Sequence, residues 1–203
     1  MRFVSLPFAL CAAAFLSGIF APNSSAQLFG SRTPQPMKRP AALISRQKGA
    51  EIKKSLEPLV TQDNSRVIVS LSKQRLYLMT GDQIYIDTPI SSGKAGHSTP
   101  GGNVRVMEKD PDHRSSLYGD FVDSKGRVVR SGVSTRIDSA PSGTRYQGAS
   151  MKWFCRLTSE GVGMHVGILP GYPASHGCVR LPSDIAPLIY QKVKVGTPVT
   201  IEQ

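Results

Sequence analysis

The sequence predicts a mostly-β domain with a single short helix near its C-terminal end. Beyond Arg66, short runs rich in β-branched and aromatic residues alternate with polar and glycine-containing turns, a pattern typical of β-strands. Only residues 183–192 combine a polar helix start with a proline in the first turn. A β-rich domain with one minor helix is therefore expected.

The first predicted strands follow one another closely. Residues 67–71 are rich in β-branched side chains, residues 75–79 come next, and Gly81-Asp82 turns the chain into residues 84–86. Further strands are predicted at 104–107, 127–129, 151–157, 162–166 and 199–201.

The predicted helix has a defined beginning and end. Ser183 or Asp184 is expected to be the N-cap, and the helix is expected to run to about Lys192. Pro187 falls in or next to the first turn, where its missing N–H matters least.

The N-terminal residues 1–26 read as a signal peptide. Arg2 supplies the positive end, residues 3–20 are mostly apolar, and Ser24-Ser25-Ala26 offers small residues to a signal peptidase. A retained membrane anchor is the alternative, but Pro7 and Gly18 interrupt the apolar run. We therefore expect export to the periplasm or cell wall, with the membrane involved only through this transient segment.

Residues 27–65 are predicted to be a linker. Three prolines at positions 34, 36 and 40 lie among basic residues, a composition that argues against a packed unit. Within it, residues 47–57 are compatible with a short helix that Pro58 stops. The remaining residues, 66–203, then form the folded domain.

The chain is strongly basic, with a formal net charge of +11. Nucleic acid is a common partner for such a balance, but no nucleic-acid motif is present and an exported protein rarely meets one. Attraction to anionic wall polymers or membrane surfaces is the simpler explanation of this charge. The alternative is that the charge serves only general solubility. No nucleic-acid partner is expected.

A cysteine and two histidines carry the strongest functional signal. Cys178 lies in Ser175-His176-Gly177-Cys178-Val179-Arg180, and His165 lies upstream in Gly163-Met164-His165-Val166-Gly167. A thiol becomes a good nucleophile once an imidazole takes its proton. The glycine before the cysteine permits a tight turn that points backbone N–H groups at a developing oxyanion. The pattern predicts covalent acyl chemistry at Cys178.

This motif resembles the YkuD-type catalytic domain of bacterial L,D-transpeptidases, the cysteine enzymes that cross-link peptidoglycan stem peptides. The resemblance also covers Ser98-Thr99-Pro100-Gly101-Gly102, which is similar to a turn in these domains, and the C-terminal residues 196–201. It spans about residues 66–203 and implies a curved, barrel-like β-sandwich. It further implies that a segment within residues 108–150 covers the active site, although an exposed insertion is an equally open interpretation.

The resemblance assigns roles to the motif residues. Cys178 would be the nucleophile, His165 the general base, and the Val166 carbonyl the group that orients the imidazole. The backbone N–H groups of His176, Gly177 and Cys178 would form the oxyanion hole.

Other side chains have two open interpretations each. Arg180 would bind a stem-peptide carboxylate or form a salt bridge within the domain. Trp153 would line the substrate groove or pack in the core, and Ser175 would contact substrate or hydrogen-bond within its own loop. His97 and His113 are expected to be surface residues.

Zinc binding and disulfide formation are the two alternative uses of the cysteines. A zinc site of His165, His176 and Cys178 would have only three ligands and lacks a paired-ligand motif, so no metal and no cofactor are expected. A disulfide between Cys155 and Cys178 would consume the nucleophile, and Cys155 fits a buried strand position instead.

The sequence thus predicts an exported L,D-transpeptidase. Cys178 would attack the third residue of a tetrapeptide stem, release the terminal D-alanine, and pass the acyl group to an amine. That acceptor would be another stem, a lipoprotein lysine or a free D-amino acid. With water as acceptor the enzyme would be an L,D-carboxypeptidase or an amidase, and a non-catalytic wall-binding module is the alternative from another class.

Overall fold

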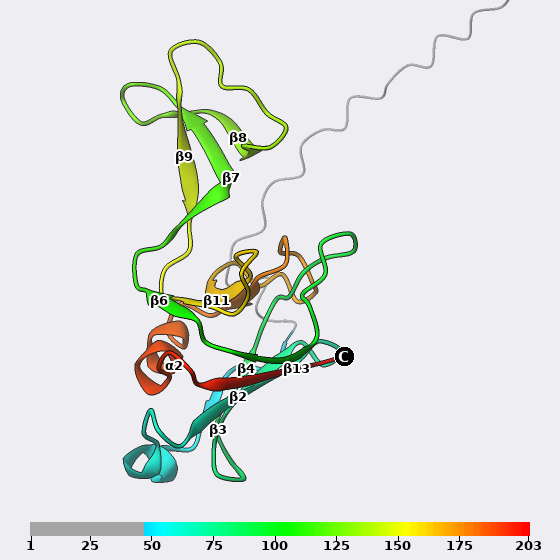
Figure 1. Ribbon diagram of the computed structural model, residues 1–203, viewed down its shortest axis with the longest axis vertical. Coiled ribbons are helices and arrows are strands. Elements are labelled where there is room, and N and C mark those ends of the chain that lie inside the picture. Colours follow the sequence, from blue (N-terminus) through cyan, green and yellow to red (C-terminus); the bar gives the residue numbers. More distant parts are fainter. Residues whose placement is uncertain (1–46) are drawn as a thin grey trace, which may run out of the picture. The chain divides into compact units, whose positions relative to one another are not determined.

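The computed structural model describes residues 47–203 (Figure 1). The predicted signal peptide and its cleavage site after Ala26 lie outside the described residues, as does most of the predicted linker. Within the described part, no helix is long and apolar enough to cross a membrane.

The largest sheet has six strands in the spatial order β1-β4-β3-β2-β13-β5. All neighbours are antiparallel except β13 and β2, which run parallel. The first three predicted strands are confirmed as β2, β3 and β4, with the turn between the last two at Gly81-Asp82. The strands are β1 (Glu51–Ile52), β2 (Ser65–Ser70), β3 (Arg75–Thr80), β4 (Gln83–Pro89), β5 (Gly102–Arg105) and β13 (Pro198–Glu202).

A second sheet has the order β12-β11-β10-β6. Its strands are β6 (Glu108–Asp110), β10 (Phe154–Arg156), β11 (Gly163–Val166) and β12 (Val179–Leu181). Strands β11 and β12 are parallel, with His165 opposite Arg180. This register brings the histidine-bearing strand beside the residues that directly follow Cys178.

A third sheet occupies residues 114–150, within the segment 108–150 that has few long apolar runs. It contains β7 (Arg114–Val122), β8 (Val128–Ser134) and β9 (Arg145–Ser150), in the order β8-β7-β9. Figure 1 shows these three strands as a separate group in green and yellow. Apart from the run 127–129, they were not predicted, because their sequences are polar and their burial is partial.

The mostly-β prediction is confirmed, with two corrections to its details. The sheets of residues 47–203 do not close into a barrel, and this part of the chain contains two helical elements instead of one. Helix α2 (Ala186–Lys192) has Pro187 in its first turn as predicted, but its N-cap is Ile185 and no side chain caps it. The buried Ile185 and Ala186 place the helix start by packing, so the polar Ser183 and Asp184 remain exposed before it.

The described part of the predicted linker is packed, contrary to expectation. Strand β1 pairs with β4, and a 3₁₀ helix, η1 (Lys54–Leu59), contains Pro58 instead of ending before it. Leu56 and Val60 are buried in the core. Proline fits a tight helical turn at a position whose backbone nitrogen needs no hydrogen-bond partner. The prolines farther upstream therefore led to a predicted linker that ends too late in the chain.

One hydrophobic core lies between the two larger sheets and α2. Its buried members come from both sheets and from the helix: Val67, Leu76, Leu78, Ile86, Met164, Val179, Leu181, Ile189 and Val199 are among them. The core therefore fixes β11 and β12, and with them the two ends of the loop that carries Cys178.

Candidate active site

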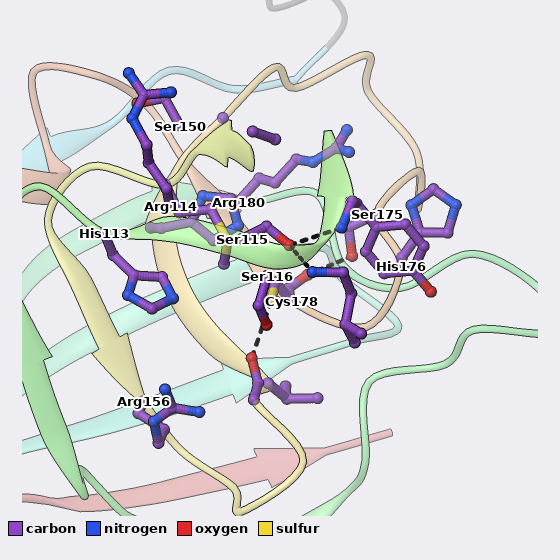
Figure 2. A pocket seen from close by; sticks show the side chains of 18 of the residues that line it. His113, Arg114, Ser115, Ser116, Ser150, Arg156, Ser175, His176, Cys178 and Arg180 are labelled. Carbon is purple, nitrogen blue, oxygen red and sulfur yellow. Dashed lines mark hydrogen bonds between the residues drawn. The ribbon is translucent and has the colours of Figure 1, made fainter. Parts of the chain in front are cut away.

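Cys178 opens into a pocket of about 560 Å³ (Figure 2). The pocket is lined from three directions: by the loop before β12, by β11 with the preceding turn at 159–162, and by the β7 and β9 ends of the third sheet. His165, His176 and Arg180 line it together with Cys178. The structure thus brings the motif residues into one cavity.

Hydrogen bonds hold the loop that presents the thiol. The Ser175 hydroxyl, 1% exposed with its residue, donates to the Cys178 carbonyl at 2.5 Å and accepts from the Gly177 N–H at 3.1 Å. Gly177 has a φ of 117°, a conformation open to glycine but costly for other residues. Ser175 therefore serves the loop, which is one of its two predicted roles, and its hydroxyl is not free for a substrate.

A residue upstream also clamps this loop, and it was not predicted as functional. The buried Thr99 hydroxyl donates to the Gly177 carbonyl at 2.7 Å and accepts from the Gly93 N–H at 2.9 Å. The sequence indicated a turn at Thr99-Pro100, but only the folded chain shows that this turn supports Gly177.

His165 is held in one tautomer. Its Nδ1–H donates to the Val166 carbonyl at 2.7 Å, which leaves Nε2 as the basic nitrogen. The bulk of the valine side chain does not prevent this bond. The Cys178 thiol has only a long contact of 3.8 Å to the Gly161 carbonyl, and no hydrogen bond joins it to His165 in the described structure.

Burial keeps this pair neutral at rest. Burial raises the pKa of the Cys178 thiol, while the Gly163 N–H and the charges of Arg180 and Arg156 lower it in part. Burial also lowers the pKa of His165 to about 4, against the hydrogen bond from its ring to Val166. A thiol and a neutral imidazole are therefore the resting species, and the two arginines favour the thiolate once it forms.

The backbone donors near the thiol are fewer than expected. The Gly177 N–H is used by Ser175, whereas the N–H groups of His176 and Cys178 have no partner among residues 47–203. Two backbone donors next to the thiol therefore remain available to a ligand. Gly177 contributes through its backbone conformation instead.

Three arginines give the pocket a positive wall. Arg180 is half-buried and makes no salt bridge or side-chain hydrogen bond within the described residues, so the salt-bridge interpretation has no partner there. Arg156 is held by Glu108 at 2.5 Å, and Arg114 donates to the Gly148 carbonyl at 3.0 Å. An anionic ligand is the natural complement of this wall.

Trp153 does not line the pocket. It packs partly buried against the core and meets Tyr190 edge-on, with ring centroids 5.2 Å apart. The core interpretation therefore describes its position, and its φ of 59° shows a strained backbone directly before β10.

The remaining histidines differ in burial and in surroundings. His97 is exposed and lies edge-on to His176, at 4.7 Å between centroids, while Tyr118 of β7 stacks on His176 at 4.3 Å. His113, expected at the surface, is half-buried and lines the pocket. Its place was missed because the sequence around it reads as a polar loop.

Both cysteines of the described chain are free thiols. Cys155 is buried in β10, as predicted, and burial raises its pKa to about 12. Across residues 47–203 no three acidic, histidine or cysteine side chains gather into a metal-binding group.

Comparison with known proteins gives a consistent result. A family model for the L,D-transpeptidase catalytic domain (YkuD) matches residues 64–201, which is more than half of the chain and includes His165 and Cys178. No curated protein matches the chain.

Several solved structures share the fold. An L,D-transpeptidase from Mycobacterium smegmatis is 21% identical, with 69% of this chain and 59% of that chain covered and a TM-score of 0.52. One from Stackebrandtia nassauensis is 18% identical, covering 81% and 64%, with a TM-score of 0.50. The L,D-transpeptidase LdtMt1 in complex with imipenem is 22% identical, covering 68% and 58%, with a TM-score of 0.51. The match thus spans less than two thirds of these structures' own chains.

Proposed function

The chain belongs to the L,D-transpeptidase catalytic-domain family, and from that premise we propose that it is a cysteine acyltransferase acting on peptidoglycan stem peptides. Cys178 is the nucleophile, His165 the general base, and a tetrapeptide stem the acyl donor. The Val166 carbonyl orients His165 through its bond to Nδ1.

In the donor step, Nε2 of His165 takes the proton of the Cys178 thiol as the sulfur attacks the carbonyl carbon of the third stem residue. The thiol gives up its weak contact to Gly161 to reach the base. The free N–H groups of His176 and Cys178 stabilise the oxyanion. The C–N bond breaks, the imidazolium of His165 protonates the departing D-alanine amine, and a thioester remains.

In the acceptor step, an amine attacks the thioester carbon. The C–S bond breaks, an amide forms, and the thiol is restored. The products are an L,D-cross-link when the amine belongs to another stem, or an anchored protein when it belongs to a lipoprotein lysine.

Arg180 binds a carboxylate of the donor in this proposal. Its guanidinium faces the cavity and has no protein partner in the described chain. Replacing it with glutamine removes the charge at similar length. We expect a higher KM for the tetrapeptide and a smaller change in kcat.

One observation supports the proposal most: in a chain of this family, the free Cys178 and the buried His165, whose tautomer the Val166 carbonyl fixes, line the same pocket. The test is mass spectrometry of the purified protein with a disaccharide tetrapeptide and, separately, with imipenem. We expect loss of D-alanine, a transfer product, and an imipenem adduct on Cys178. Cys178→Ala should abolish all three.

The products identify the reaction that takes place. A tripeptide without cross-linked product would identify a carboxypeptidase that uses water. Binding without turnover and without an adduct would contradict the enzymatic proposal and favour a wall-binding module.

Export is part of the proposal because the substrate lies outside the cytoplasm. We propose that residues 1–26 are removed and that the mature chain begins at Gln27. N-terminal sequencing of protein recovered from the cell envelope tests this. An intact Met1 would indicate a retained anchor.

A further inference from the structure

We propose that His113, oriented by Asp110, is a second acid–base residue of this site and takes the proton of the acceptor amine. The inference rests on the proposed function and deepens it, because it separates the group that serves the donor from the group that serves the acceptor.

His113 lies where β6 leads into β7 and is part of the pocket wall. Figure 2 shows His113 and His176 on opposite sides of Cys178 in that view, with Arg156 below His113. Both histidines and Cys178 line the pocket that would hold the substrate.

Two contacts orient the His113 ring. Its Nδ1 lies 3.1 Å from Asp110 Oδ2, and its face stacks on Phe154 with centroids 4.2 Å apart and planes inclined by 12°. The carboxylate accepts the Nδ1–H, so Nε2 carries the lone pair. The carboxylate thereby fixes both the tautomer and the orientation of the ring.

The outward nitrogen is free to act. Nε2 of His113 has no hydrogen-bond partner among residues 47–203, and the only fully buried unpartnered side-chain atom there is Oε1 of Gln47. His113 Nε2 is therefore not fully buried, and the side chain, which is 21% exposed, lines the pocket. A structural histidine that merely packed on Phe154 would not need an aligned carboxylate.

His165 is poorly suited to the acceptor's proton. An amine arrives as an ammonium ion at neutral pH and must lose a proton before it attacks. His165 is only 7% exposed, so an ammonium ion that arrives from solvent reaches this imidazole less readily. His113 is more exposed and has a carboxylate partner, which suits it to receive a cation.

The charges around His113 are mixed. Asp110 faces Nδ1, the Arg156 guanidinium lies 5.4 Å from the Phe154 ring centre, and the charge of His113 acts on His165. Arg114 is the next residue in the chain. Asp110 is the only one of these groups that hydrogen-bonds the ring, which makes it the positioning residue of the pair.

The proposed step balances. The ammonium ion passes one proton to Nε2 of His113, and the neutral amine attacks the thioester carbon. The C–S bond then breaks, the departing sulfur takes the second amine proton by way of His165, and His113 returns its proton to solvent.

The experiment compares acylation with transfer in the full-length protein. Imipenem adduct formation measures the first step, and transfer from a disaccharide tetrapeptide to D-methionine measures the second over a range of pH. His113→Phe preserves a ring for the stack on Phe154, and His113→Gln is the second variant. We expect transfer to slow by about 10²-fold in both, while adduct formation stays within about threefold of wild type.

Two further variants separate chemistry from structure. Asp110→Asn keeps an oxygen for the bond from the Asp112 N–H but loses the charge that supports His113. Asp110→Asn should slow transfer and shift the pH profile of transfer. Asp112→Asn changes an exposed neighbouring residue in the same way, so it is the matched control and should behave like wild type.

The outcomes are distinct. Equal slowing of acylation and transfer would overturn the inference and make His113 a structural residue, as would unchanged transfer and pH profile in His113→Phe. Failure of the wild-type protein to form an adduct or release D-alanine would overturn the proposed function itself, and the inference with it.

Discussion

Thr99 offers the sharpest test of how the site is built. Its hydroxyl joins the Gly93 N–H and the Gly177 carbonyl, which belong to segments 84 positions apart. Thr99→Val preserves shape and removes both bonds. Because Thr99 is 3% exposed, water does not readily replace the hydroxyl.

The expected loss of folding free energy follows from the two backbone groups that Thr99→Val leaves without a hydrogen-bond partner. Leaving a buried donor or acceptor unsatisfied costs about 1–3 kcal/mol each. One of the two bonds is only partly buried, so the total should be about 2–4 kcal/mol. The Gly177 carbonyl also loses its anchor, and we expect slower imipenem acylation in the fraction that remains folded.

Urea unfolding with a matched control measures this loss. Thr99→Ser keeps the hydroxyl and should cost about 1 kcal/mol or less, for the lost methyl group. A valine variant that unfolds within 0.5 kcal/mol of wild type, a threshold at about the limit for surface changes, would refute the idea that Thr99 holds the Cys178 loop.

Three more predictions follow from burial and close packing. Gly163→Ala should unfold at least about 2 kcal/mol more easily than wild type, because the new Cβ would lie 2.3 Å from the Phe154 ring and 2.6 Å from the Cys155 carbonyl; chemical denaturation measures this, and a neutral change would contradict the packing. The free energy of unfolding should fall by roughly 3 kcal/mol between pH 6.5 and 4, because the unfolded chain protonates His165 more readily than the folded one. His165→Asn should flatten that dependence, and identical pH curves for variant and wild type would count against it. In the native protein iodoacetamide should label Cys178 only, since burial raises the pKa of Cys155 to about 12; labelling of Cys155 before unfolding would show that its strand opens.

The sequence was sufficient for the parts of the fold that bury alternating apolar residues. Strands β2, β3 and β4 were predicted from their runs of β-branched and other apolar residues. In the structure Val67, Leu76 and Ile86 of these runs lie in the core. The chemistry of Cys178 and His165 was also readable, because a cysteine after a glycine with an upstream histidine is a local pattern.

Residues whose roles depend on distant partners could not be predicted in this way. Strand β9 has no buried residue, and β7 buries residues only in its second half, so hydrophobic periodicity gave no signal. Thr99 and His113 act through Gly177 and Asp110, and His113 reaches the pocket because β6 pairs with β10. Such roles arise from tertiary contacts that no local pattern records.

The third sheet is joined to the site differently from the other two. Within the described chain, no hydrogen bond or ion pair links residues 114–150 to the rest of the domain, yet β7 supplies pocket wall and Tyr118 stacks on His176. The Cys178 loop, by contrast, is bonded to the main body by the Thr99 hydroxyl and by the backbone of Ser175, which pairs with Ser92 and Lys94. Substitutions in the third sheet can therefore change what the pocket accepts without loosening the nucleophile. This division of labour matches the proposed reaction, in which the thioester chemistry is fixed and the acceptor varies.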